Sequence, residues 1–167
     1  MTIADFDYLE QDAKIELLTK CCGSANWVSK MLAAPIAEDL VNLEDLAEVK
    51  WYECTEDDWR EAFLHHPKIG NMQSLKEKYS DTKEWASNEQ SGVGNANGQT
   101  LQELANANEV YERKFGFIFI VCATGKSASQ MLDILNSRLH NDIETEIKIA
   151  AEEQLKITQL RLEKLFL

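Results

Sequence analysis

The sequence predicts an all-α protein, a single helical bundle of about eight to nine helices. Apolar residues recur at three- and four-residue steps over most of the chain, and helix-capping Ser or Thr residues precede several of these runs. Only the stretch 116–125 is rich in aromatic and β-branched residues. Since no second such stretch is available to pair with it, we expect it to be an unpaired extended segment rather than part of a sheet.

Composition limits the number of domains and the kinds of partner. The chain has 167 residues, 44% of them hydrophobic, which is enough for one domain over residues 1–167 with a substantial core. Its net charge of -12 repels phosphate backbones and anionic membrane surfaces. No apolar run is long enough to span a bilayer. We therefore expect neither a nucleic acid nor a membrane as partner.

The four cysteines predict a reducing compartment. They are Cys21, Cys22, Cys54 and Cys122, and none forms a Cys-x-x-Cys pair. The first five residues turn acidic at once and do not look like a secretion signal. These features indicate thiols in a cytoplasmic protein. Cys122 lies in an apolar run, which favours a small core residue over a nucleophile.

The first half of the chain is predicted to be helical throughout. Residues 3–22 form one or two short helices with Gly23 suited to the C-terminal cap, and Ser24 caps a helix that Pro35 ends. A longer helix covers 37–54, with its acidic residues on the solvent side. Thr55 then begins the next helix, because with Asp58 it has the pattern of a capping box.

That helix is followed by two histidines and then by a loop that begins with a proline. A residue before proline is pushed out of the helical region, so the helix should end near His65 and leave His66, which precedes Pro67, beside a cleft. Imidazole at such a junction can exchange protons near neutral pH. A single histidine is nevertheless more often a hydrogen-bonded surface or core residue than a catalyst.

In the second half of the chain the helical periodicity is weak in some segments and strong in others. We expect a loop over 70–82, a helix over 83–91, polar turns over 91–98 and a helix over 100–115. The segment 116–125 should cross the core as a connector whose peptide groups can line a pocket. Ser127 caps a helix that runs to Leu139, and the last helix covers 142–165.

Two further residues could carry chemistry beside His66. Glu89 could be an ordinary surface carboxylate, and Arg161 could be only a long side chain that reaches water. Spacing alone does not separate these readings from functional ones. No His-x-x-x-His pair or acidic cluster favours a metal site, so we expect no metal.

Four motifs, in order along nearly the whole chain, resemble the family of 2-oxo-4-hydroxy-4-carboxy-5-ureidoimidazoline (OHCU) decarboxylase. They are His66-Pro67-Lys68-Ile69-Gly70, Glu89-Gln90-Ser91-Gly92, the run 114–123 (KFGFIFIVCA), and Lys156-Ile157 with Leu160-Arg161-Leu162. The resemblance implies the last step from urate to (S)-allantoin. It also implies an all-helical homodimer, a small anionic ureidoimidazoline substrate, and catalysis without a metal or an organic cofactor.

By this resemblance His66 is the catalytic acid/base, Glu89 is its carboxylate companion and Arg161 is a substrate-binding cation. The other implied substrate-binding residues are Pro67, Ala86, Gln90, Val121, Ala123 and Gly125. Ala86 departs from the family pattern, because many members carry a hydroxyl there, so one substrate hydrogen bond must come from elsewhere. A carboxylate near the imidazole would favour its protonated form.

Two alternatives stay open at the level of sequence. The chain could be a non-enzymatic acidic interaction module with the same fold, or a related lyase or hydrolase acting on another ureido compound. The joint presence of His66, Glu89 and Arg161 favours an enzyme. The last helix also carries apolar residues on more than one face, which together with the resemblance predicts a homodimer; these residues are Leu160, Leu162, Leu165, Phe166 and Leu167.

Overall fold

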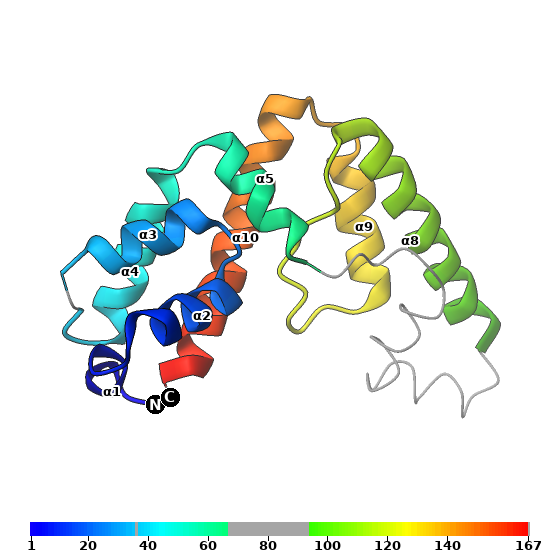
Figure 1. The fold of residues 1–167 in the computed structure, drawn as a ribbon. Helices are drawn as coiled ribbons and strands as arrows, with labels where there is room; N and C mark the ends of the chain where they lie inside the picture. The colour runs from blue at the N-terminus through cyan, green and yellow to red at the C-terminus, as the bar shows by residue number, and fades with distance from the viewer. Residues whose placement is uncertain (36, 67–93, 167) are drawn as a thin grey trace. The chain divides into compact units, whose positions relative to one another are not determined.

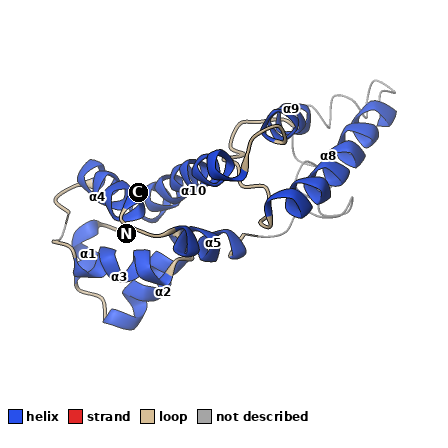
Figure 2. Ribbon diagram, turned by 90° about the horizontal axis from the view of Figure 1, so that it is seen from above, coloured by secondary structure: helices blue, strands red, loops and turns tan. Residues whose placement is uncertain are grey.

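The computed structural model describes residues 1–35, 37–66 and 94–166, with residues 94–97 described by their backbone alone. These residues form eight α-helices, and no β-strand occurs among them (Figure 2). The all-α prediction is therefore confirmed, and the stretch 116–125 joins no sheet within the described chain. None of the helices in these ranges is both long and apolar enough to cross a membrane.

The described residues divide into two compact units. The first unit comprises residues 1–66, 120–122 and 147–166, and the second comprises the described residues of 94–119 and 123–146. The helices lie in the order α1 (Ile3–Asp7), α2 (Gln11–Cys21), α3 (Ala25–Ala33), α4 (Leu40–Tyr52), α5 (Glu56–Leu64), α8 (Gly94–Phe115), α9 (Ala128–Arg138) and α10 (Ile143–Phe166) (Figure 1). Helix α10 contributes residues to both units.

Helix starts in the first unit follow the capping residues that the sequence indicates. The Ser24 hydroxyl accepts a hydrogen bond from the Trp27 amide at 3.2 Å, which begins α3. Thr55 and Asp58 form a complete capping box at the start of α5. Helix α3 ends at Ala33, two residues before Pro35, as predicted.

Buried tryptophans tie the helices of the first unit together. Trp27 is fully buried, and its indole donates to the Ala47 carbonyl of α4 at 3.1 Å. Trp51, also buried, donates to the Ala151 carbonyl of α10 at 2.9 Å. Each indole thus fills the core and satisfies its single donor across a helix-helix contact. The two chain ends also meet in this unit (Figure 1), where the Phe6 ring packs edge-on against Phe166 at 5.5 Å.

Gly23 has a different role from the one that the sequence suggests. The C-terminal cap of α2 is Cys22 in an extended conformation, and Gly23 is not among the described glycines with positive φ. A β-carbon added at Gly23 would lie 2.2 Å from Cγ of His65. The helix-cap interpretation was therefore wrong: Gly23 allows the base of the His65 side chain to lie against the backbone.

The helix predicted for 100–115 begins earlier, at Gly94. Residues 94–98 were predicted to form turns, because Gly and Asn have low helix propensity. Extending an existing helix costs much less than nucleating one, so the apolar face from Leu101 onward carries the helix back through these residues. The C-terminal end follows expectation, since Gly116 adopts φ +74 directly after Phe115.

In the second unit, α8 and α9 pack side by side (Figure 1) over a buried polar group. Glu146 is completely buried and accepts hydrogen bonds from Arg138 Nε at 2.7 Å, from Asn141 Nδ2 at 2.9 Å and from the Tyr111 hydroxyl. The Arg138 guanidinium also lies 4.7 Å from the centre of the Phe119 ring. A buried carboxylate is tolerated here because a cation and two neutral donors surround it.

The apolar residues of the last helix are partly used within the chain. Leu162 is fully buried, and Phe166 packs on Phe6. Leu160 and Leu165 are half-buried, and Leu167 lies outside the described residues. The surface offered to a partner is therefore smaller than the sequence suggested.

Candidate active site

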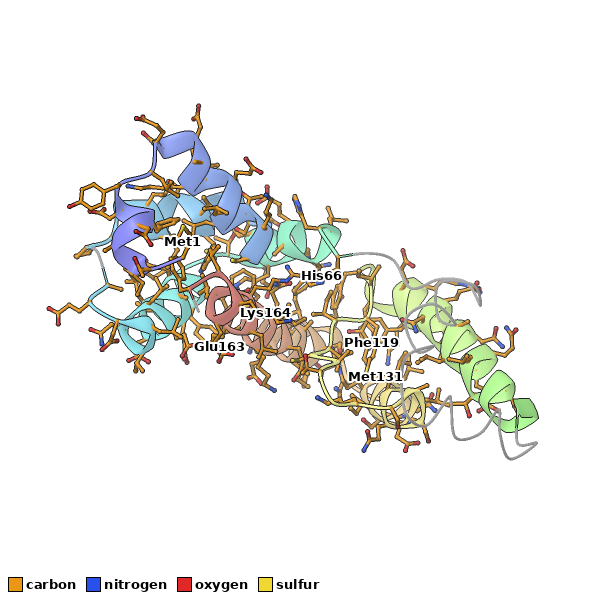
Figure 3. The ribbon with its side chains drawn as sticks, turned by 90° about the horizontal axis from the view of Figure 1, so that it is seen from below. Met1, His66, Phe119, Met131, Glu163 and Lys164 are labelled. Atoms are coloured by element: carbon orange, nitrogen blue, oxygen red, sulfur yellow. The ribbon has the colours of Figure 1, made fainter. Side chains whose placement is uncertain are left out.

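His66 lies immediately after α5, where the sequence placed it. Helix α5 ends at Leu64 with His65 as C-cap, and the His66 amide still donates to the Phe63 carbonyl at 3.2 Å. This bond fixes the backbone of His66, the first residue after the helix cap. The His66 side chain, labelled in Figure 3, turns toward α10 and is half-buried.

Helix α5 itself is held by polar contacts to the start of α3. The Glu61 carboxylate accepts from the Ala25 amide at 3.0 Å, and the Asp58 carboxylate accepts from Asn26 Nδ2 at 2.9 Å. A carboxylate at a helix N-terminus satisfies an amide that has no partner within the helix. These contacts fix the position of the helix that carries His66.

The main partner of His66 is a buried glutamine. Nε2 of His66 lies 2.5 Å from Oε1 of Gln154, whose side chain is completely buried in α10. Gln154 Nε2 donates to the Thr158 hydroxyl at 3.2 Å, and this hydroxyl donates to the Gln154 carbonyl at 3.0 Å. The chain from histidine to glutamine to threonine therefore holds the imidazole at a defined place.

Arg161 lies on the same face of α10. It follows Gln154 by seven residues, which is nearly two helical turns or about 10 Å along the axis. Its Nη1 donates to the Lys20 and Cys21 carbonyls at 3.2 Å each, at the C-terminal end of α2. A cation is favoured there by the negative end of the helix dipole. These bonds use one guanidinium nitrogen and fix the side chain on the face that also bears Gln154.

The thiols nearest to Arg161 are unsuited to nucleophilic chemistry. Burial raises the pKa of the Cys22 thiol to about 12, although a hydrogen bond with the Ser24 backbone lowers it in part. Burial likewise raises the pKa of Cys21 to about 11, against the opposing charge of Arg161. Both thiols stay protonated at neutral pH.

In the predicted binding segment 121–125, the backbone amide of Cys122 already has a hydrogen-bond acceptor within the protein. The Cys122 amide donates to the Glu153 carboxylate of α10 at 2.7 Å. Gly125 adopts φ +74 in a turn that the Lys126 amide closes on the Ala123 carbonyl at 3.1 Å. Val121 is half-buried. That the backbone of this segment contacts substrate stays a prediction.

Pro67, Ala86, Glu89 and Gln90 lie outside the described residues. The convergence of Glu89 on His66 therefore stays a prediction. Within residues 1–35, 37–66 and 94–166, no three His, Cys, Asp or Glu side chains are grouped as metal ligands would be.

Sequence reasoning missed Gln154, Thr158 and Glu153, although one signal was available. The buried stripe of α10 comprises Ile147, Ala150, Ala151, Gln154, Leu155, Thr158 and Leu162. Gln154 and Thr158 are polar residues at positions where an apolar one would be expected. Such residues are informative, because a buried polar side chain is retained only with partners.

A family model for OHCU decarboxylase matches residues 7–163, nearly the entire chain. The chain belongs to the OHCU decarboxylase family. Among solved structures, the chain is similar to an OHCU decarboxylase crystallised in the presence of (S)-allantoin, with 37% identity, a TM-score of 0.70, and coverage of 89% of this chain and 95% of the other. This similarity agrees with the helical fold described above.

Two curated proteins are also similar to this chain in sequence. The uric acid degradation bifunctional protein TTL of Arabidopsis thaliana is 36% identical over 87% of this chain and 45% of its own length. The 2-oxo-4-hydroxy-4-carboxy-5-ureidoimidazoline decarboxylase of Xenopus laevis is 30% identical over 61% of this chain and 58% of its own length. The chain thus spans about half the length of these relatives.

Proposed function

We propose that this chain decarboxylates OHCU to (S)-allantoin in urate degradation. The observation that supports this most directly is the placement of His66, fixed by Gln154 on the α10 face that also carries Arg161. An acid/base group and a cation, both held by hydrogen bonds beside the same face of α10, fit a small anionic substrate. The membership of the chain in the OHCU decarboxylase family supports the same substrate.

In the proposed mechanism His66 is the proton donor. Loss of carbon dioxide leaves an electron pair on the ring carbon, and the adjacent ring C=N unit accepts it. The ureido-bearing carbon of that C=N unit must then receive a proton on one face to give a single enantiomer. A positioned imidazole contributes about 10²- to 10⁴-fold in rate to such a transfer. Glu89 would stand beside it and favour the imidazolium.

Arg161 is the proposed cation for the substrate carboxylate. The net charge of -12 repels an anionic substrate at long range, so the site needs a local positive charge. Because Nη1 of Arg161 is held by the α2 carbonyls, the planar guanidinium is oriented before substrate arrives. Pro67, Ala86, Gln90 and the backbone at Val121, Ala123 and Gly125 complete the proposed binding set.

We further propose that residues 1–167 act as one decarboxylase domain, in a cytoplasmic homodimer that needs no metal or organic cofactor. The match of a single family model across both compact units supports the first point. Light scattering at micromolar concentration tests the assembly: a dimeric mass is expected, and a monomeric mass would contradict it.

Product chirality tests the proposed reaction. Freshly generated OHCU should decay spontaneously to racemic allantoin, whereas the enzyme should give optically active product at an accelerated rate. Circular dichroism of the reaction mixture follows both quantities. The His66→Gln variant, checked for folding, is the control and should approach the uncatalysed rate. Racemic product at the uncatalysed rate from the wild-type protein would end the proposal.

A further inference from the structure

Gln154 is a fully buried polar side chain in the apolar stripe of α10. Its helical neighbours on this stripe, Ala151 and Leu155, are buried and apolar. A buried amide costs stability unless its donor and acceptor are both satisfied. The partners of Gln154 therefore show what this residue does.

The hydroxyl of Thr158 determines which way the amide faces. Thr158 has one hydroxyl proton, and it donates this proton to the Gln154 carbonyl at 3.0 Å. Toward the Gln154 side chain the hydroxyl can then only accept, so the NH₂ group faces Thr158 at 3.2 Å. Oε1 of Gln154 consequently faces His66.

An amide oxygen only accepts hydrogen bonds, so Nε2 of His66 must carry a proton. In the neutral imidazole the lone pair is then on Nδ1. We infer that Gln154 is a positioning residue that holds neutral His66 in the Nε2–H tautomer, so that Nδ1 is the nitrogen that exchanges protons. The catalytic part of this inference rests on the proposed function.

The proton balance of the proposed step follows from this tautomer. Imidazolium His66 gives its Nδ1 proton to the ureido-bearing ring carbon, next to the carbon from which carbon dioxide has left. The hydroxyl proton on that neighbouring carbon goes to the ring nitrogen of the former C=N unit, and the hydroxyl becomes the carbonyl of allantoin. The imidazole becomes neutral, and Nε2 keeps its proton and its bond to Gln154 Oε1 throughout. Nδ1 then takes a proton from solvent, so each turnover consumes one proton and releases one carbon dioxide.

The tautomer can be observed without any assay of activity. Long-range ¹H–¹⁵N correlation spectra of uniformly labelled protein, at a pH where the ring is neutral, distinguish protonated from unprotonated imidazole nitrogens. Loss of one ring system in His66→Gln assigns its signals among the three histidines of the chain. The wild-type spectrum should show Nε2 protonated and Nδ1 unprotonated. A wild-type ring protonated on Nδ1 would overturn the inference.

Three variants separate positioning from packing. Gln154→Met keeps side-chain length but removes the acceptor, so it should give mixed tautomers and lower kcat by roughly 10- to 100-fold. KM should stay within about twofold, because ground-state binding is not removed. Gln154→Glu restores an acceptor and should restore the Nε2–H tautomer. Gln159→Met makes the same change at a half-buried position of α10 and should alter neither quantity.

The outcomes for the inference and for the proposed function can be told apart. A Gln154→Met variant that is folded by circular dichroism and retains the wild-type tautomer would refute the positioning role. If instead the tautomers behave as expected but wild-type product is racemic at the uncatalysed rate, the decarboxylase proposal fails and with it the catalytic role of Nδ1. Optically active product together with an unchanged kcat in Gln154→Met would refute only the inference.

Discussion

Replacing Gly23 by alanine should destabilise the protein through His65. The added β-carbon would lie 2.2 Å from Cγ and 2.5 Å from both Cβ and Cδ2 of His65, well under the 3.0 Å that real β-carbons respect. Cβ and Cγ are at the base of the side chain, so rotation of the ring cannot relieve the clash. The end of α5 must move instead.

The expected cost is about 1–3 kcal/mol, the range for overpacking a well-packed site. For a chain of this size, 1 kcal/mol corresponds to about 2–4 °C in melting temperature, so Gly23→Ala should melt roughly 2–12 °C below wild type. Because His66 follows His65 directly, the same displacement should also lower the rate of the proposed decarboxylation. Calorimetry and a rate assay on the same sample measure both effects.

The rescue and the control make this prediction specific. His65→Gly removes all three clashing atoms and should restore Gly23→Ala to near the stability of His65→Gly alone, whereas His65→Ala keeps Cβ at 2.5 Å and should rescue only in part. Gly98→Ala, where a β-carbon meets nothing within 4 Å, should instead stabilise α8 by about 0.5–1 kcal/mol. A Gly23→Ala protein as stable as wild type, or one that His65→Gly does not rescue, would refute the reasoning.

Two other sets of variants test the site and the second unit. In steady-state assays with fresh OHCU, His66→Gln should lower kcat by about 10²- to 10⁴-fold. The loss should be smaller for Glu89→Gln and smallest for His65→Gln. A larger loss for His65→Gln than for His66→Gln would show that the catalytic role was assigned to the wrong histidine. Arg138→Met leaves the Glu146 carboxylate buried without its cation, so denaturant unfolding should show a loss of about 3–5 kcal/mol, partly recovered by adding Glu146→Gln. Equal stability of single and double variants would argue against the ion pair as the cause.

Local signals predicted most of the helical fold. The N-cap side chains of Ser24 and Thr55 accept hydrogen bonds from amides only three residues away, those of Trp27 and Asp58. Their roles as N-caps could therefore be predicted from the sequence. The start of α8 was missed because propagation from a stable helix overrides weak local propensity. Gly23 was misinterpreted for the opposite reason, since the atom that requires a glycine there belongs to His65, distant in sequence.

The site was predictable only where a motif marked it. His66 was found from its position before Pro67, but the partner that orients it is 88 residues away on another helix. Periodicity assigns Gln154 to the buried face of α10, yet it does not say which group that amide meets. A polar residue at a core position is therefore a reason to look for a distant titratable partner. In this chain, that search leads from Gln154 to the imidazole that the proposed chemistry requires.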